Sequence, residues 1–332
     1  MRRALAGATA LLCAAACGGG SSVDASGGDR VGVVIKGLDN PFFAAMRQGV
    51  LAAARDRQAD VRVSAATGLQ DTAGQASKLE ALVAQGLDCY VVNPISQANL
   101  VPALSHVPKG TPIVNVDSPV DAREARGLGV KISTYIGTDN AAAGRLAAAA
   151  MAGFVGHGGH VGVVGGIPGD ATSAARIAGF DAGARGRFRV LAPVNADWEA
   201  GKASLAAGTL LRTRPQIDGF FAANDEMALG IARAVADAGR SGRVAIVGVD
   251  GIEPALRAIE RGALSATVSQ YPYTIGKLGV EGCLAAAAGK TLPRRVDAPI
   301  QVITKRNVAR ARAKFPEPVK PFRSPFAAPL GN

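Results

Sequence analysis

Aromatic residues and histidines are scarce in this chain of 332 residues. Aromatic side chains make up 5% of it, with a single tryptophan, and there are three histidines. The longest apolar stretch, Ala4 to Ala16, is shorter than the roughly twenty residues that a membrane-spanning helix needs. His157 and His160 lie among glycines, without a carboxylate or cysteine at metal-site spacing. The sequence therefore predicts neither a transmembrane helix nor a metal site.

The excess of positive charge lies mostly at the two ends of the chain. The formal net charge is +11, of which Arg2 and Arg3 supply two and residues 305–323 supply six. The remaining charge is too small for a nucleic-acid-binding surface. The glycine-rich stretch 165–169 lacks the Gly-Lys-Ser/Thr ending of a phosphate-binding loop, and Pro168 removes a backbone donor. We therefore expect no nucleic-acid partner and no cofactor.

The first residues follow the pattern of an export signal, with two arginines, an apolar stretch and small residues before Cys17. The sequence Ala-Ala-Ala-Cys at 14–17 resembles a bacterial lipoprotein box, whose cysteine becomes the lipidated first residue. This predicts a signal peptide at 1–16, and a lipidated Cys17 with a flexible tether at 17–29. Plain secretion after Ala16 is the alternative. We expect an exported chain that is anchored to the outer face of the bacterial cytoplasmic membrane.

Two further cysteines, Cys89 and Cys283, lie in the body of the chain. Cys89 lies in an apolar strand-like run and Cys283 in an alanine-rich helical run. Each is therefore expected to be a small buried hydrophobic residue rather than half of a disulfide.

The end of the chain, 307–332, is basic and rich in proline. Residues 315–332 contain five prolines and no apolar periodicity. We expect this stretch to be a disordered or loosely packed tail.

From residue 30 onward, short apolar runs alternate with helical patterns of about fifteen residues. This alternation predicts parallel sheets whose faces are covered by crossover helices. About eight strand-like runs precede residue 250, and 135–140 interrupts the pattern midway. Two doubly wound, Rossmann-like lobes fit this better than one large sheet. The expected fold class is α/β, with the ligand site where the carboxyl ends of the two sheets face each other.

Polar residues follow almost every predicted strand at the end where that site is expected: Lys36, Asn40, Asn93, Asp117, Arg176, Asn224, Asp250 and Gln270. One aspartate in such a place is often only a helix cap or a turn former. A set of polar residues as large as this one predicts donors and acceptors for ligand hydroxyls, with an arginine between carboxylates to compensate their charge. Paired carboxylates could also serve a glycosidase. We disfavour an enzyme because neutralising arginine contacts keep both carboxylates ionised.

Three of the scarce aromatic residues lie at the same predicted edge. Phe42 and Phe43 follow Asn40-Pro41 at a helix start, and Trp198 lies at a strand end in the second lobe. Capping explains Asn-Pro but not two consecutive phenylalanines. Neighbours on a helix point about 100° apart, so one phenylalanine can pack inward while the other faces the cleft. We expect these aromatic rings to enclose the apolar faces of a pyranose.

Nine segments between 30 and about 306 carry a specific family likeness: 36–43, 92–94, 114–117, 138–140, 172–180, 196–198, 223–228, 248–251 and 266–270. In this order they resemble the periplasmic monosaccharide-binding proteins of the ribose type. The resemblance implies the type I periplasmic binding protein fold, in which two lobes joined by three chain crossings close over one sugar. The sugar then passes to an ABC permease.

The resemblance also implies domain boundaries and a ligand set. The N-terminal lobe is expected to comprise 30–137 and 271–298, and the C-terminal lobe 138–270 and 299–306. Phe42 and Phe43 are expected to face Trp198 across the sugar, and hydrogen bonds to come from Asn40, Asn93, Asp117, Arg176, Asn224, Asp250 and Gln270. The implied protein is a monomeric binding protein of an importer. A role in sensing, through a chemoreceptor or a sensor kinase, is the less favoured alternative.

Two positions depart from the ribose binders. Lys36 stands where they have a small hydroxyl residue, and Ser118 stands where they have an arginine. Lys36 and Trp198 look more like the allose binders, which carry an acidic residue at the position of Ser118. The expected ligand is therefore a pentose or hexose of the ribose or allose kind. A tetritol or pentitol is the alternative.

Overall fold

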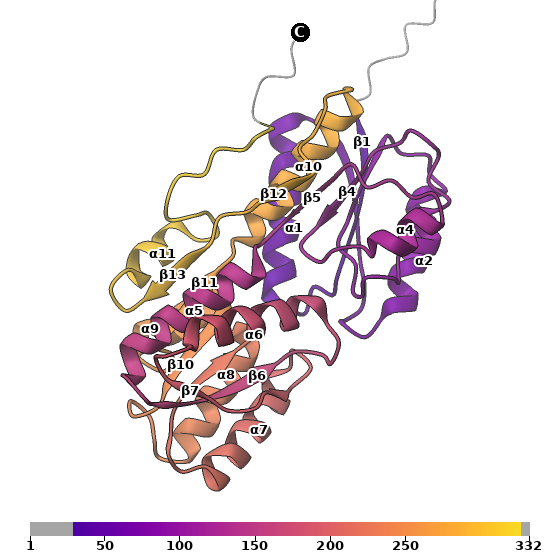
Figure 1. Cartoon of the computed structure of the whole chain (residues 1–332). Coiled ribbons are helices and arrows are strands. Elements are labelled where there is room, and N and C mark those ends of the chain that lie inside the picture. Colours follow the sequence, from indigo (N-terminus) through magenta and orange to yellow (C-terminus); the bar gives the residue numbers. More distant parts are fainter. Residues whose placement is uncertain (1–28, 327–332) are drawn as a thin grey trace, which may run out of the picture.

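The computed structural model describes residues 29–326 and consists of two α/β lobes (Figure 1). The N-terminal lobe contains a six-stranded sheet of order β12-β5-β4-β3-β1-β2 in which every pair is parallel. Its strands are β1 (Arg30–Ile35), β2 (Asp60–Ala65), β3 (Cys89–Val92), β4 (Ile113–Val116), β5 (Thr134–Gly137) and β12 (Arg295–Asp297). Its helices are α1 (Pro41–Arg57), α2 (Thr72–Val83), α3 (Val101–Leu104), α4 (Ala122–Gly127) and α10 (Pro272–Ala287).

The C-terminal lobe contains a seven-stranded sheet of order β13-β11-β10-β9-β6-β7, with β8 paired to β6. Its strands are β6 (His160–Gly165), β7 (Arg189–Val190), β8 (Val194–Asn195), β9 (Ile217–Ala222), β10 (Ala245–Asp250), β11 (Ala266–Ser269) and β13 (Gln301–Thr304). Its helices are α5 (Asn140–Val155), α6 (Ala171–Ala184), α7 (Ala200–Thr213), α8 (Asp225–Asp237), α9 (Glu253–Arg261) and α11 (Val308–Lys314). The expected α/β fold of two lobes is confirmed. One pair departs from the parallel pattern: β13 runs antiparallel to β11.

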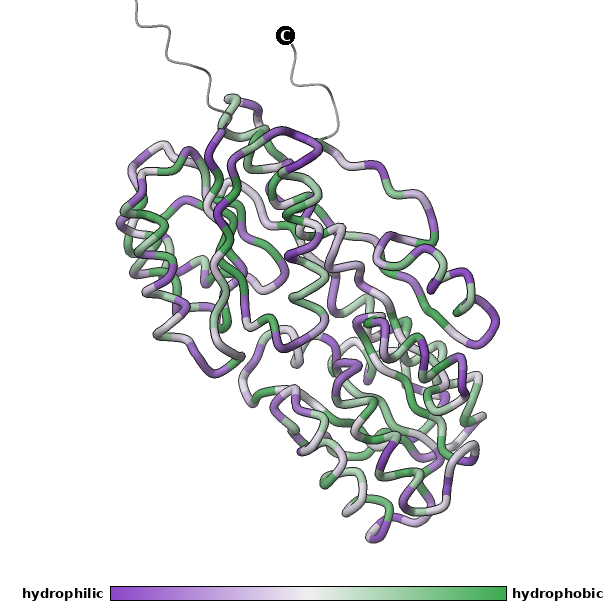
Figure 2. The backbone as a smooth tube through the Cα atoms, turned by 180° about the vertical axis from the view of Figure 1, so that it is seen from behind, coloured by the Kyte–Doolittle hydropathy of each residue, from purple (hydrophilic) through white to green (hydrophobic). Residues whose placement is uncertain are grey.

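The chain crosses between the lobes three times: between β5 and α5, between β11 and α10, and between β12 and β13. The stretch 135–140, expected to interrupt the pattern, contains the end of β5 and the first crossing. Hydrophobic stretches run through both lobes (Figure 2). Because the strands of each sheet are parallel apart from β13, and helices cover both faces, the carboxyl ends of these parallel strands point toward the space between the lobes.

Close helix packing in the C-terminal lobe places a residue at that space. Gly144 of α5 and Gly179 of α6 face the neighbouring helix backbone, and a Cβ on Gly144 would overlap the carbonyl oxygen of Arg176. Only glycine permits this approach. The two helices therefore fix the first turns of α6, and with them Arg176, against the lobe.

The expectation that Cys89 and Cys283 are separate thiols is wrong. The two residues form a disulfide between β3 and α10, with Cα atoms 5.8 Å apart. Both are fully buried, as expected. Because α10 returns from the second lobe to cover the first sheet, it brings together two cysteines that are 194 residues apart in sequence.

The expectation of a loose tail is also wrong for the part that the structure describes. Residues 308–314 form α11, and 315–326 then run back from the C-terminal lobe onto the N-terminal lobe (Figure 1). Val319 and Phe326 are buried, and the Phe326 ring packs beside Gly282 of α10. The Ser324 hydroxyl donates to the Glu281 carboxylate at 2.6 Å. Apolar side chains between the prolines give this segment a surface to bury, which proline content alone does not reveal.

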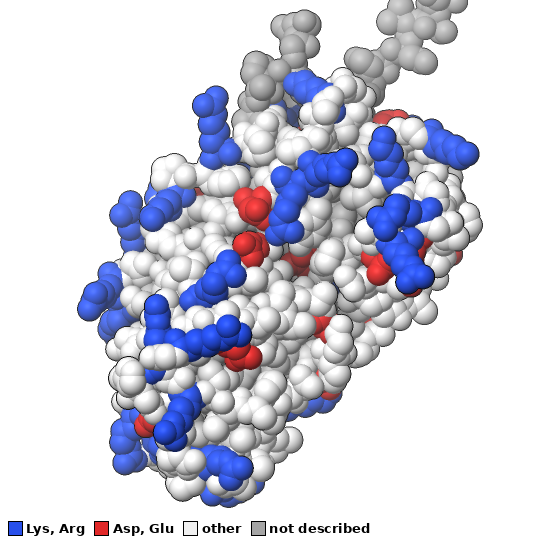
Figure 3. Space-filling view, in the orientation of Figure 1, with Lys and Arg blue, Asp and Glu red and all other residues white. Residues whose placement is uncertain are grey.

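Within residues 29–326, no helix is long and apolar enough to cross a membrane. Lys and Arg side chains are spread over both lobes on the face seen in Figure 3 rather than gathered in one patch. The predicted signal peptide and Cys17 lie outside the described residues.

Candidate functional site

A cavity between the two lobes lies at the carboxyl ends of their strands. It encloses about 420 Å³, including the part that is open to solvent. Its walls are the segments that follow β1, β2 and β4 in one lobe and β6, β8, β9 and β10 in the other. The lining residues are Lys36, Asn40, Phe42, Phe43, Leu69, Asp117, Ser118, Asp170, Thr172, Arg176, Trp198, Asn224 and Asp250. We call this space the interlobe cavity.

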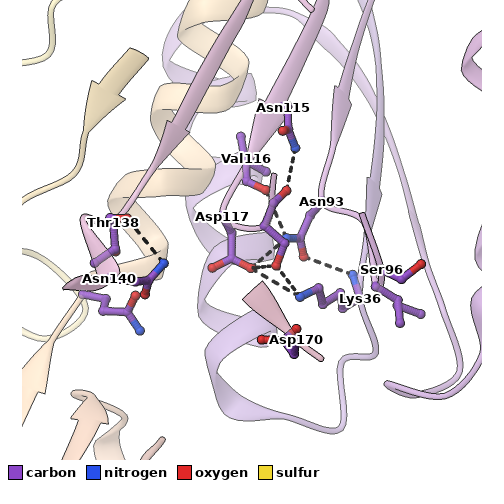
Figure 4. Close-up of polar contacts among 12 residues, drawn as sticks. Lys36, Asn93, Ser96, Asn115, Val116, Asp117, Thr138, Asn140 and Asp170 are labelled. Carbon is purple, nitrogen blue, oxygen red and sulfur yellow. Dashed lines mark hydrogen bonds and ion pairs between the residues drawn. The ribbon is translucent and has the colours of Figure 1, made fainter. Parts of the chain in front are cut away.

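Asp117, directly after β4, is held from several sides (Figure 4). Its Oδ2 accepts hydrogen bonds from Asn93 Nδ2 at 2.8 Å and from Ser118 Oγ at 3.2 Å. The Tyr135 hydroxyl donates to its main-chain carbonyl oxygen at 2.5 Å. The backbone φ of +61° is uncommon for a residue other than glycine, and such strain is concentrated at functional sites. Among the described residues, Oδ1 has no hydrogen-bond donor and remains available to a ligand.

Lys36 is buried beside this carboxylate. Its Nζ donates to Ser118 Oγ at 2.6 Å and lies 3.7 Å from Asp117 Oδ2. The same ammonium lies 5.3 Å from the centroid of the Phe43 ring, within the range of a cation–π contact. These partners compensate the buried charge, while an ammonium group has three N–H donors. Lys36 therefore has donors left for a ligand.

Arg176 holds the opposite side of the interlobe cavity. Its guanidinium donates through Nη1 to the carbonyl oxygen of Ala223 at 2.6 Å and to Asp250 Oδ1 at 3.3 Å. Nε donates to Asn140 Oδ1 at 2.9 Å. The guanidinium carbon lies 5.7 Å from the centroid of the Trp198 ring. Its side chain is only 4% exposed, so these contacts fix the charge inside the site.

Asp250 ends β10 and is shared between two donors. Gln270 Nε2 donates to the same Oδ1 at 2.6 Å as Arg176 does. Burial raises the pKa of the Asp250 carboxyl above its usual range, while the Arg176 guanidinium opposes that shift. Its backbone φ is +134°, again in the region that favours glycine. Hydroxyl donors of a ligand would stabilise the charged form of this carboxylate.

The aromatic residues lie on two sides of the interlobe cavity. Phe42 and Phe43 meet edge to face, with ring centroids 5.2 Å apart, and both line the cavity and both belong to a buried hydrophobic cluster that includes residues of both lobes. The expected division into one inward and one cleft-facing ring is therefore wrong. Trp198, with φ of +68°, lies against Gly166, where a Cβ would overlap its ring. The tryptophan position thus depends on a glycine directly after β6.

Nine of the eleven residues expected to bind ligand line the interlobe cavity. The other two, Asn93 and Gln270, are fully buried behind it, where they orient Asp117 and Asp250. Asn40 and Asn224 also cap α1 and α8, because their side chains accept from the main-chain N–H groups of Phe42 and Met227. No group of three or more metal-ligating side chains occurs in the described part of the chain.

Several lining or supporting residues were not foreseen. Asp170 and Thr172 line the interlobe cavity from the start of α6. Behind the cavity wall, Asn140 accepts a hydrogen bond from Arg176, and Tyr135 donates one to the main chain of Asp117. Asp170 follows a strand and caps α6, accepting from the Ser173 N–H at 2.8 Å. The strand-end rule that selected the other residues could have found it.

Asp225 supports the site from below Asp250. Its Oδ2 accepts from the N–H groups of Gly251 and Ile252, and its Oδ1 accepts from the Thr267 hydroxyl at 2.7 Å. This holds the loop that follows β10. Complete burial raises the pKa of Asp225 from 3.8 to about 6, against these hydrogen bonds.

Replacing Asp225 by asparagine is expected to flatten the pH dependence of stability between pH 4 and 6. The folded wild type retains a proton that the unfolded chain has lost, so its free energy of unfolding falls as pH rises, by at most about 1.4 kcal/mol per pH unit. Asparagine has no such proton and can still accept from Gly251 and donate to Thr267. Urea unfolding at pH 4, 5, 6 and 7 measures the difference, with Asp237→Asn, exposed on the same helix, as the control. A difference that is constant over this range would contradict the prediction.

Residues 31–291 match the family model described as periplasmic binding protein domain. The D-allose-binding periplasmic protein of Escherichia coli is 33% identical over 266 residues, covering 79% of this chain and 86% of that protein. The ribose import binding protein of Bacillus subtilis is 31% identical over 277 residues, covering 83% and 87%. A periplasmic solute-binding protein of an ABC transporter from Actinobacillus succinogenes, solved with bound D-allose, superimposes with a TM-score of 0.79 at 30% identity, covering 85% of this chain and 99% of that one.

Proposed function

Because the chain belongs to the periplasmic sugar-binding proteins of the ribose and allose type, we propose that its interlobe cavity binds one monosaccharide for delivery to an ABC permease. One observation carries this proposal. Two lobes contribute complementary halves of one cavity, with a fixed carboxylate in each, a buried cation beside each carboxylate, and aromatic rings in both walls. That combination suits a neutral ligand with a hydroxyl rim and apolar faces.

In the bound state, Asp117 and Asp250 accept from sugar hydroxyls, and Lys36, Arg176, Asn40 and Asn224 donate to or accept from others. Each carboxylate already has a cationic partner, so a neutral ligand leaves no buried charge uncompensated. The ring lies between the phenylalanines and Trp198. Asn93 and Gln270 act as positioning residues because they touch the carboxylates from behind.

Neither lobe alone can satisfy a sugar, so the ligand is expected to favour the closed arrangement of the lobes. The lobes that move are 30–137 with 271–298 and 138–270 with 299–306, and hinge motion occurs where the chain crosses between them. The closed, loaded form is what a permease distinguishes from the empty one. The protein binds without turnover and acts as a monomer outside the cytoplasm, held to the membrane by a lipid on Cys17.

The sole tryptophan provides a direct test, because Trp198 lines the interlobe cavity and lies beside Arg176. Its fluorescence is titrated with D-ribose, D-allose, other pentoses and hexoses, and their alditols. At least one of these is expected to change the emission saturably and to raise the melting temperature, since a ligand that binds only the folded state stabilises it. Trp198→Phe keeps a ring in the wall, so it should lose the fluorescence signal and retain the thermal shift. Failure of every sugar and alditol in both measurements would reject the proposal, and a response to alditols alone would select the polyol alternative.

A further inference from the structure

The interlobe cavity adjoins a second cavity, with which it shares part of its wall. Leu69, Ser118, Asp170 and Thr172 line both of them. The second cavity also lies between the lobes and encloses about 1010 Å³, including the part that is open to solvent. We call it the adjoining cavity. A ligand in the interlobe cavity would therefore have the solvent-accessible adjoining cavity beside it, on the side of Ser118.

Two of the four side chains at the junction, those of Ser118 and Thr172, are short. Ser118 comes from the N-terminal lobe, and its hydroxyl is held by Lys36 Nζ at 2.6 Å and by Asp117 Oδ2 at 3.2 Å. Thr172 faces from the C-terminal lobe. Because Ser118 is tied back to its own lobe by both contacts, it does not reach across the junction. A side chain two or three atoms longer than serine at this position would reach across the junction.

The adjoining cavity also offers unused polar groups. In the described part of the chain, the Thr172 hydroxyl, the Asp170 Oδ2 atom and the side-chain amides of Gln70 and Gln97 have no hydrogen-bond partner. Ile95 and Pro119 supply apolar surface beside them. Free donors and acceptors next to apolar patches are the lining that a sugar unit or a small organic substituent requires.

We propose that the adjoining cavity is a second subsite, and that the ligand is a monosaccharide carrying an O-linked substituent. The sugar ring of this ligand occupies the interlobe cavity, and its substituent passes between Ser118 and Thr172 into the adjoining cavity. This inference rests on the proposed function, since it assumes that the ring site binds a sugar. Ser118 is then the residue that determines whether a substituted sugar is admitted.

The test uses D-allose and D-ribose together with the derivatives of each that carry one O-methyl group, at every ring and side-chain oxygen in turn. Dissociation constants come from Trp198 fluorescence of the full chain. For the sugar that binds, we expect one methylated derivative to bind within about threefold of the parent, whereas a methyl group in a closed pocket costs about 10- to 200-fold.

Ser118→Glu should then close the junction, because its carboxylate can pair with Lys36 while its added atoms fill the passage. It is expected to weaken the tolerated derivative by about 10-fold or more relative to the parent sugar. Ser118→Ala is the matched control and should leave the junction open. Thr172→Gln narrows it from the other lobe, so the test does not depend on one variant folding well.

Loss of affinity for every methylated derivative, with the parent sugar still bound, would overturn the subsite and leave the proposed function standing. Equal weakening of parent and derivative by both Ser118→Glu and Thr172→Gln would also overturn it. Absence of binding by both parent sugars and all their derivatives would reject the ring site for this class of sugar, and the subsite with it.

Discussion

Replacing Arg176 by alanine is expected to weaken sugar binding by about 30-fold or more, which corresponds to about 2 kcal/mol or more. The guanidinium joins Asp250, the Ala223 carbonyl oxygen, Asn140 and the Trp198 ring in one buried contact. Alanine leaves Asp250 buried with Gln270 as its remaining side-chain partner. The loss of its cation would raise the pKa of Asp250 further, which disfavours the carboxylate form that should accept from the sugar.

Calorimetric titration with the sugar identified by Trp198 fluorescence measures this loss. Arg176→Lys is expected to recover only part of the affinity, because one ammonium cannot reproduce the planar set of donors that reaches three acceptors. Arg187→Ala, an exposed arginine in the same lobe, is the control. An Arg176→Ala protein with wild-type affinity would show that the guanidinium only supports the fold.

Removing the Cys89–Cys283 disulfide is expected to lower the free energy of unfolding by about 2–5 kcal/mol. The N-terminal lobe is assembled from two segments that are separated by most of the second lobe, and α10 belongs to the later one. The disulfide closes this long loop and keeps residues 89 and 283 joined when the chain is unfolded, which reduces the entropy of the unfolded state. Both sulfurs are buried, so their replacement also disturbs the core.

Urea unfolding of wild type and of the Cys89→Ala/Cys283→Ala variant, without ligand, gives the difference. Sugar affinity should change little, because neither cysteine lines the interlobe cavity. Mass spectrometry of an unreduced digest should recover the two cysteines in one cross-linked peptide. Separate peptides with free thiols in the exported protein, or an unchanged free energy of unfolding, would contradict the prediction.

The two-lobe fold and most of the residues that line the cavity could be predicted from the sequence, because both follow from local patterns. Alternating apolar and helical runs predict parallel sheets, and parallel sheets place all their strand ends at one edge. Since the two sheets were also expected to face each other at these edges, Asp117 and Asp250 could be expected in one cavity without knowledge of their contacts. The residues behind them, such as Asn140 and Asp225, are less visible in sequence, because capping or simple burial accounts for an isolated polar residue equally well.

The errors concern contacts that depend on the path of the chain through both lobes. The pairing of Cys89 with Cys283 requires knowing that α10 returns to cover β3. The packing of 315–326 requires knowing that Val319 and Phe326 meet the N-terminal lobe, because the prolines of this stretch exclude a regular helix and leave no pattern that shows where its apolar side chains pack. Phe42 and Phe43 both reach the interlobe cavity because the start of α1 lies at its wall, so helix geometry alone could not assign one ring to the core.

Native mass spectrometry of the chain incubated with the sugar that gives the largest Trp198 response tests most directly whether the interlobe cavity holds one intact sugar. We expect a single added mass per chain, equal to that of the unmodified sugar, and recovery of the same sugar after denaturation. Two results would contradict this expectation: recovery of a hydrolysed, oxidised or phosphorylated product, or no bound mass at concentrations that saturate the fluorescence change.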